Sequence, residues 1–459
     1  MRGGVVRSAR VGSTKQCGRT TVTRPRVLLI AEAANPEWVS VPLVGWAHCR
    51  ALTEVTDAHV VTHSRNRDAL TRAGWTEGRE FTTLDTEVVA APIYRAGQAL
   101  RKLTGMGWTL TTALAALPYY YFEQLLWRRF GAAIRAREYA LVHRITPLSP
   151  TTPSIIGRRC VAAGVPFVVG PLNGGVPWPP GFGRVQASEG EWLSYVRDAY
   201  KLLPGYGDTR RSAAAILVGS QSTWQQLDGH HDKCVYIPEN AIDPNLFQRR
   251  IERPVTPPLR LAFVGRLVPY KGADMLLEAA APLVRAGQVT IDIIGDGPEK
   301  ARLAALVTEL QIGAGVKLDG WIEHKHLQAR LVESDVFAFP SVREFGGGVV
   351  LEAMALGLLP VVADYAGPRE LVTDDTGVRV SMGSREDLVR GFRDTLAHLV
   401  AHPELIRPMG ERARARTLSL FTWQAKAKQT LEVYRWVMEG GPKPSFGMPL
   451  SDAAGPGRA

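Results

Sequence analysis

Short apolar runs of β-type residues alternate with longer amphipathic stretches along most of this 459-residue chain. The first run is Arg26-Val-Leu-Leu-Ile30, and the segment from Pro42 to Leu52 after it has the pattern of a helix. Similar runs follow at 55–62, 140–143, 166–170, 215–219 and 234–237. Because parallel strands need crossover connections, which are usually helices, this alternation predicts an α/β fold with parallel sheets covered by helices on both faces.

A second set of such segments begins at Leu259, after the proline-rich stretch 253–258. Strands are expected at 261–264, 290–294, 336–339 and 359–363, with helices around 273–286, 298–311, 325–333 and 348–357. The chain therefore divides into a basic tail (1–24), an N-terminal domain (25–250), a linker (251–258), a C-terminal domain (259–420), a closing helix (421–438) and a second tail (439–459). We expect both tails to be disordered and the two doubly wound domains to face each other. Such sheets bind ligands beyond the carboxyl ends of their strands, which places the site between the domains.

The positive charge of the chain is concentrated before its first acidic residue, Glu32. The net charge is +11, and seven of the Lys and Arg residues precede Glu32, which leaves +4 for the rest. A nucleic-acid-binding protein spreads its basic residues over a folded face, so we expect no nucleic-acid partner. The four cysteines are far apart in sequence, which indicates a reducing compartment and no structural zinc.

The segment 106–122 carries no charged residue and is flanked by basic residues. It is shorter than the ~20 residues of a membrane-spanning helix, and Pro118 interrupts it. Two interpretations stay open. The segment is either a partly buried helix pair or an interfacial patch that rests on a membrane through its aromatic side chains. We expect a cytoplasmic protein, and the second interpretation would place it on the inner face of the membrane.

Two glycines and two cations follow the predicted strand at 261–264. Gly265 and Gly272 let the backbone turn tightly, while Arg266 and Lys271 place positive charges at the carboxyl end of the strand. A planar guanidinium and a compact ammonium together suit a diphosphate, although a basic surface loop is the alternative.

Three glycines follow the strand predicted at 336–339 and open an apolar helix. The free backbone N–H groups at such a helix start can bind an anion. Glu344 precedes this helix and Glu352 lies about one turn inside it, so both carboxylates can face one cleft. Carboxylates accept hydrogen bonds from vicinal hydroxyls, which suits a sugar and a ribose.

Together with Gly295-Asp-Gly297-Pro298, these motifs resemble the retaining glycosyltransferases of family 4 (group 1), which have the GT-B fold of two facing Rossmann-like domains. Supporting similarity is found in Ile237-Pro-Glu-Asn240 and in Phe421-Thr-Trp423. The similarity is specific from Val264 to Gly377 and loose before Leu217. It implies an enzyme that moves a sugar from a nucleoside diphosphate to a hydroxyl acceptor.

The resemblance also implies roles for individual residues. The catalytic set would contain Arg266 and Lys271 on the diphosphate, Glu344 on the transferred sugar, and His143. The donor-binding set would contain a ribose ligand, the sugar-binding loop, the phosphate-capping N–H groups and a residue that meets the base: Glu352, Phe345, Gly346, Gly347, Gly348, Val349 and Ile322. No cofactor and no metal ion is expected, since the Arg/Lys pair can replace a divalent cation.

The N-terminal half departs from the family pattern. The family often has two glycines in its first loop, whereas Gly45 stands alone here. The segment 141–147 occupies the place of the family's histidine loop, where the family's histidine corresponds to His143 or, by register to the following proline, to Ile145. The alternative for His143 is a structural histidine at a strand end. Asn173 and Gly174 lie in a further glycine loop, which either borders the acceptor or forms a turn.

The expected function is retaining transfer of a sugar to a glycan, lipid-linked or small-molecule acceptor, in bacterial polysaccharide, glycolipid or glycoside biosynthesis. Two alternatives stay open. One is a sugar-nucleotide epimerase or hydrolase on the same fold. The other is a catalytically idle scaffold that binds nucleotide sugars.

Overall fold

The N-terminal domain is built on a seven-stranded sheet of parallel strands. The structure is a computed structural model that describes residues 24–89, 91–92, 108–183, 185, 199–249 and 253–447. Across the sheet the strands are β3 (Phe81–Leu84), β2 (Asp57–His63), β1 (Arg26–Ala31), β4 (Leu141–Thr146), β5 (Phe167–Leu172), β6 (Ala215–Val218) and β7 (Cys234–Tyr236). All residues of β4, β5 and β6 are buried, as expected for the central strands of a parallel sheet.

Helices cover both faces of this sheet because successive strand residues point to opposite sides. Leu28 of β1 packs in one cluster with Phe122, whereas the neighbouring Leu29 packs in a second cluster with Trp46. In the described residues, the α-helices of the domain are α1 (Val41–Val55), α2 (Arg67–Arg72), α4 (Trp108–Arg135), α5 (Ile156–Ala162), α7 (Tyr206–Ser212) and α8 (Gln221–Gln225).

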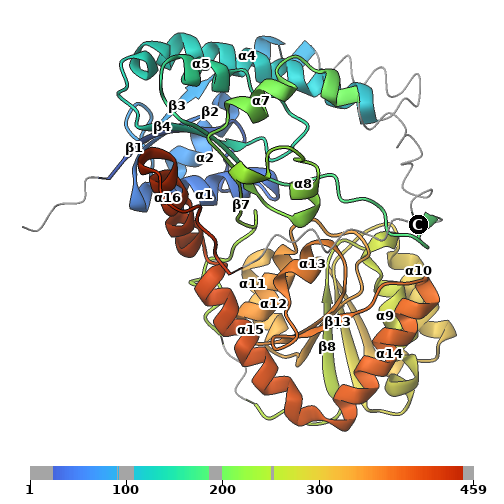
Figure 1. Ribbon diagram of the computed structural model, residues 1–459. Coiled ribbons are helices and arrows are strands. Elements are labelled where there is room, and N and C mark those ends of the chain that lie inside the picture. The colour runs from blue at the N-terminus through green and yellow to red at the C-terminus, as the bar shows by residue number, and fades with distance from the viewer. Residues whose placement is uncertain are drawn as a thin grey trace, which may run out of the picture.

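The C-terminal domain has a six-stranded parallel sheet. Its order is β10 (Val316–Gly320), β9 (Val289–Ile294), β8 (Leu259–Val264), β11 (Val336–Phe339), β12 (Leu359–Ala363) and β13 (Val378–Val380). The surrounding helices are α9 (Ala273–Arg285), α10 (Lys300–Glu309), α11 (His324–Leu331), α12 (Gly348–Ala355), α13 (Ala366–Leu371), α14 (Arg385–Ala401) and α15 (Ile406–Leu420). Figure 1 shows this domain below the N-terminal one.

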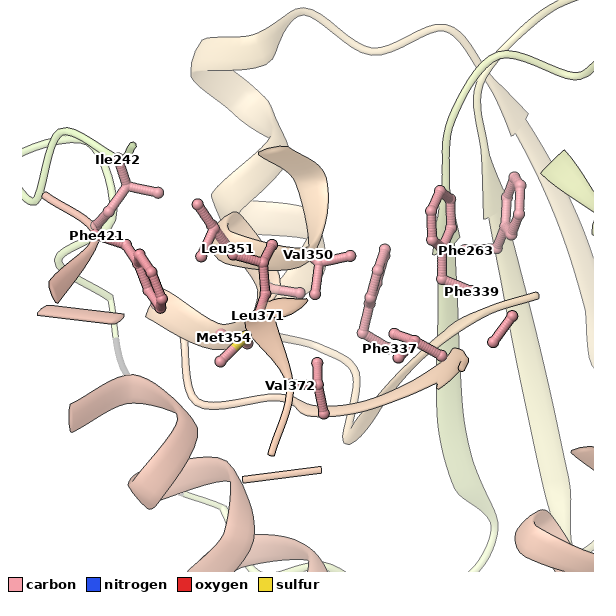
Figure 2. Close-up of a cluster of buried hydrophobic side chains, with 14 of the residues drawn as sticks. Ile242, Phe263, Phe337, Phe339, Val350, Leu351, Met354, Leu371, Val372 and Phe421 are labelled. Carbon is pink, nitrogen blue, oxygen red and sulfur yellow. The ribbon is translucent and has the colours of Figure 1, made fainter. Parts of the chain in front are cut away.

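The core of the C-terminal domain fixes the elements that carry the polar residues of interest. Figure 2 shows Phe263 of β8 and Phe339 of β11 in a cluster with Val350 and Met354 of α12. These side chains are buried. The apolar side of α12 is therefore anchored against the sheet, which fixes the direction in which the helix start points.

The last helix returns to the N-terminal domain. α16 (Trp423–Glu439) lies against α1, and Figure 1 shows it in dark red beside that helix. Its Val433 and Tyr434 are buried in the same cluster as Leu29. The crossing point is held by Ile242, whose N–H donates to the carbonyl of Phe421 over 2.8 Å. The predicted domain boundaries stay predictions in their detail, but these contacts give the closing helix a packing partner.

The predicted strands are all present, and three of the strands in the described residues were not predicted. They are β3, β10 and β13, and each lies at an edge of its sheet. An edge strand has only one neighbour and stays partly exposed, so its residues need not form a continuous apolar run. The sequences Phe-Thr-Thr-Leu, Val-Lys-Leu-Asp-Gly and Val-Arg-Val accordingly mix polar and apolar residues.

The uncharged segment 106–122 lies largely in one continuous helix. Pro118 is inside α4 and does not separate two helices, so the expected helix pair is wrong in that detail. Tyr119 and Phe122 are buried, whereas Leu117 is 47% exposed. Met106 lies outside the described residues, as do positions 1–23 and 448–459 of the predicted tails. In the described part of the chain, no helix combines the length and apolar character that a membrane crossing requires.

Candidate functional site

The loop after β8 places its two cations at the carboxyl edge of the C-terminal sheet. Arg266 is exposed, and no described residue forms an ion pair with it. Lys271 ends a short 3-10 turn and is followed by Gly272 at φ 75°. A methyl group on Gly272 would lie 2.6 Å from the carbonyl oxygen of Pro340, so only glycine lets this loop approach the neighbouring one.

Lys271 forms an ion pair with Glu344, which comes from the loop after the adjacent strand β11. Both side chains are 16% exposed. The Lys271 ammonium also lies 5.6 Å from the ring centre of Tyr270 and 5.4 Å from that of Phe339. Little water surrounds this pair, so its electrostatic interaction is stronger than that of a surface pair.

The glycine loop 346–348 turns tightly under Glu344. The second carboxylate oxygen of Glu344, Oε1, accepts from the backbone N–H of Gly347 over 3.3 Å. Gly347 has φ 59° and precedes the first residue of α12. A methyl group on Gly346 would overlap side-chain atoms of Glu239 and Asn240 from the N-terminal domain. The loop thus lies where the two domains meet.

The first turn of α12 points its N–H groups toward this region. Gly348 and Val349 begin the helix, and the first N–H groups of a helix have no acceptor within it. Glu352 lies one turn further along, and its Oε1 is 2.8 Å from Nε2 of His324. The hydrogen bond to Glu352 raises the pKa of His324 above its ordinary value.

The loops after β9 and β10 complete the edge. Gly295 has φ 148°, and a methyl group there would overlap the carbonyl oxygen of Gly265. The Gly295 N–H donates to the carbonyl of Gly320 over 2.7 Å. Ile322 packs partly buried against the core, while Trp321 is 70% exposed. Gly295 therefore lets the loop after β9 pack against the loop after β8 and against the end of β10. Ile322 lies in the loop that follows β10.

His143 is held inside the protein by two hydrogen-bond partners, which favours the structural alternative over the catalytic role expected for it. The residue is fully buried in β4. Its Nδ1 is 2.6 Å from the Tyr434 hydroxyl of α16, and its Nε2 is 2.7 Å from the carbonyl of Gly170. Burial lowers the pKa of His143 to about 3, so the ring is neutral at physiological pH. This position fits the structural alternative, because His143 links strand β4 to the closing helix α16.

Gly45 is also a packing residue in this structure. It is buried in α1, and a methyl group there would overlap the carbonyl oxygen of Ala33. Its expected contact with an acceptor has no support from this position. The reason for glycine is instead the close approach of α1 to the loop after β1.

Asn173 and Gly174 lie in the loop after β5. Asn173 is 6% exposed, and its Oδ1 accepts from the Ser220 hydroxyl over 2.9 Å. Gly174 is partly exposed, and its carbonyl accepts from Thr223 over 3.3 Å. Both residues are thus held by the segment 220–223. Their role toward an acceptor stays a prediction.

Contacts between the two domains could not be predicted from the sequence. The Trp178 ring, from the loop after β5, lies 4.7 Å from the guanidinium of Arg343 and 6.2 Å from the ring of Tyr270. The Tyr365 hydroxyl donates to the carbonyl of Pro177 over 2.8 Å. These contacts bring the N-terminal loop over the neighbours of Lys271 and Glu344. The only sequence signal was the proline-rich composition of 177–180.

Two further residues of this interface carry shifted pKa values. Burial raises the pKa of Glu239, and the adjacent Glu344 raises it further, against the effects of Asn173 and Lys426. Burial lowers the pKa of Lys426, whose ammonium donates to the backbone carbonyl of Glu239. The partly buried Glu239 carboxyl thus lies against Gly346, and the buried Lys426 amine holds the backbone of Glu239.

A cavity of 240 Å³ lies between the domains beside the Lys271 loop. Phe182 and Val185 line it from the N-terminal domain, and Pro269 and Asp274 line it from the C-terminal domain. Among the residues that the structure describes, no cluster of His, Cys, Asp or Glu could hold a metal ion.

Two facing parallel α/β domains, with cations and carboxylates at the carboxyl edge of the second, define the two-domain GT-B class. Residues 245–416 match the family described as "Glycosyl transferases group 1". This match covers most of the C-terminal domain, where the motifs at 265–272 and 344–352 resemble the same family.

The curated relatives align with less than half of the chain. A phosphatidylinositol N-acetylglucosaminyltransferase of Arabidopsis thaliana is 30% identical over 44% of this chain and 43% of its own length. D-inositol 3-phosphate glycosyltransferase of Segniliparus rotundus is 33% identical over 39% of this chain and 40% of its own. The chain thus spans about half the length, or less, of these relatives.

Solved structures share the fold along nearly the whole chain. Sucrose-phosphate synthase of Thermosynechococcus elongatus has a TM-score of 0.59 at 18% identity, covering 91% of this chain and all (100%) of that one. HepE of Anabaena, solved in complex with UDP, has a TM-score of 0.54 at 17% identity over 89% and 98% of the two chains. Both support the GT-B fold assignment.

Proposed function

We propose that this protein is a glycosyltransferase that takes a sugar from a nucleoside diphosphate and transfers it to a hydroxyl acceptor. The observation that carries the proposal is the Lys271–Glu344 ion pair, which joins the loop that carries the exposed Arg266 to the loop that precedes α12. A cation pair and a helix start suit a diphosphate, and a carboxylate beside them suits sugar hydroxyls. The curated relatives, which are named glycosyltransferases, support this assignment.

In the proposed complex, Arg266 and Lys271 bind the diphosphate, and the N–H groups of Gly348 and Val349 cap its outer phosphate. Negative charge grows on the diphosphate as the bond between the sugar and the leaving oxygen breaks. Cations and N–H groups that are already in position stabilise this charge without reorganisation. This supplies the main catalytic effect and needs no metal ion.

Glu344 and the backbone of Phe345, Gly346 and Gly347 position the transferred sugar. Glu352 accepts from the ribose hydroxyls, and the backbone near Ile322 meets the base. We assign Glu344 a positioning role because its two oxygens already bind Lys271 and the Gly347 N–H. A nucleophilic carboxylate would have to leave both partners.

The proposed transfer keeps the configuration of the sugar. The acceptor oxygen forms its bond on the face from which the diphosphate leaves, and the acceptor proton passes to a diphosphate oxygen. No protein nucleophile is then required, unlike the paired carboxylates of retaining hydrolases. Domain closure over the donor would exclude water and limit hydrolysis.

For the acceptor, we propose a chemical class. Two relatives are named for phosphatidylinositol and for D-inositol 3-phosphate, which favours an acceptor in glycolipid, polysaccharide or glycoside biosynthesis. A cytoplasmic location, with contact to the inner face of a membrane through 106–122, belongs to the same proposal. Vesicle co-sedimentation of the protein with anionic lipid tests that contact.

The first experiment is calorimetric titration with UDP-, GDP-, ADP- and dTDP-sugars, with and without EDTA. We expect one donor to bind equally well in both conditions, followed by transfer to an acceptor panel. Release of free nucleotide without an acceptor would favour the epimerase or hydrolase alternative. Tight binding with no turnover would favour the idle scaffold. Binding that EDTA abolishes would contradict metal independence.

A further inference from the structure

Glu352 has a partner that its expected role does not explain. His324, the first residue of α11, places Nε2 2.8 Å from Oε1 of the Glu352 carboxylate. Glu352 is 19% exposed and His324 is 51% exposed, so the pair lies at the rim of the site. The two residues come from different helices, 28 positions apart in sequence.

The hydrogen bond makes the two oxygens of the Glu352 carboxylate different, because only Oε1 binds His324. Oε1 accepts from the imidazole, while a ribose hydroxyl needs an acceptor oxygen that already faces the nucleoside. A free glutamate side chain loses rotamer freedom when it binds a ligand. A carboxylate that is already held by a neighbour loses less, so its affinity for hydroxyl donors is higher.

The imidazole is itself held in place. The ring of Phe247 contacts the His324 ring edge-on, with 5.9 Å between the ring centres and an interplanar angle of 69°. Phe247 is buried and belongs to the segment that leads out of the N-terminal domain. The Glu352 hydrogen bond raises the pKa of His324, because the carboxylate stabilises the protonated ring. The neighbouring Lys325 and His326 are instead directed to Glu323.

We propose that His324 is a positioning residue for nucleoside recognition: it holds Oε1 of Glu352 so that Oε2 accepts from a ribose hydroxyl of the donor. The inference rests on the proposed function, because it assumes that a nucleoside diphosphate binds at this edge. It concerns the nucleoside and not the sugar. Changes at His324 should therefore act on donor affinity far more than on the chemical step.

The test measures binding of nucleoside diphosphates by calorimetry. His324→Ala should weaken binding of the preferred nucleoside diphosphate about tenfold, the scale of one hydrogen bond to a charged group. His324→Gln keeps an N–H donor and should restore most of the affinity. His326→Ala, on the same helix, is the matched control and should bind like the wild type. In turnover assays His324→Ala should raise KM while kcat changes little.

A ligand lacking the ribose hydroxyls separates this role from a general structural one. With the 2′,3′-dideoxy form of the same nucleotide, His324→Ala and wild type should bind equally. In the Glu352→Ala background, His324→Ala should cause no further loss, because the two residues act as one unit. Equal losses with both ligands, additive losses, or wild-type affinity of His324→Ala would each overturn the inference. Failure of the wild type to bind any nucleoside diphosphate would instead overturn the proposed function itself.

Discussion

Lys271 and Glu344 are 73 positions apart, yet their side chains form an ion pair across the carboxyl ends of two adjacent strands. Each is followed closely by a glycine with positive φ: Gly272 after Lys271 and Gly347 after Glu344. The glycines let the two loops turn back toward each other, and the strand pairing brings the loops side by side. The pair is therefore a product of strand order and of local turn chemistry together.

Replacing Lys271 by Met should reduce turnover by at least about 100-fold, the scale of losing one preorganised charge donor. Steady-state kinetics with the preferred donor measures this, and thermal unfolding should show that the fold survives. Lys428→Met, at an exposed position on α16, is the control and should leave both quantities unchanged. Full activity of Lys271→Met would remove the main support for the diphosphate site.

Replacing Gly295 by Ala should destabilise the C-terminal domain by at least about 1 kcal/mol. The added methyl group would overlap the Gly265 carbonyl oxygen, and φ at this position is 148°. Chemical denaturation measures the loss. Gly313→Ala is the matched control, because its methyl group would meet only a side-chain atom of Val307 at 3.9 Å. Equal stability of both variants would contradict the close packing of these two loops.

Replacing His143 by Ala should lower stability and leave chemistry almost intact. The variant loses a buried ring and leaves the Tyr434 hydroxyl without its acceptor, which costs about 1–3 kcal/mol for the unpaired group alone. Denaturation and kcat, measured below the unfolding transition, separate the two effects. Tyr434→Phe removes the same hydrogen bond and should be milder. A kcat reduced about 100-fold with unchanged stability would restore the catalytic role first expected for His143.

Glu370 of α13 should make stability fall as the pH rises through the range from 4.5 to 7. It accepts from the backbone N–H of Gln221 over 3.0 Å and from the Tyr236 hydroxyl, both in the other domain. Burial raises its pKa from 4.5 to about 7. Between these values the folded protein binds more protons at this group than the unfolded chain does, so the free energy of unfolding decreases with pH.

Denaturation curves between pH 4.5 and 8 test this contribution. Glu370→Gln keeps the acceptor oxygen but cannot ionise, so its stability should decline less steeply than that of the wild type below pH 7. Asp374→Asn, an exposed change near the same helix, should follow the wild-type slope. Parallel curves for Glu370→Gln and wild type would show that this carboxyl does not titrate in the stated range.

Local pattern along the chain was enough to predict the central strands and the turns that follow them. Strand β11 is a continuous apolar run, β8 is apolar from Leu261 to Val264, and glycines mark the loops after both strands. The motifs at 265–272 and 344–352 therefore located the residues of the C-terminal sheet edge. Edge strands such as β10 were not predicted, because their residues are partly exposed and need not form an apolar run.

Which polar residues meet was not predictable in the same way. His143 lies in the segment that resembles the family's histidine loop, but the return of α16 buries it against Tyr434. The pairing of His324 with Glu352 depends on how two helices lie at one sheet edge. Such contacts join residues 28 to 291 positions apart, and side-chain pattern along the chain carries no information about them. Strand order and domain packing supply it, because they alone set which loop ends are neighbours.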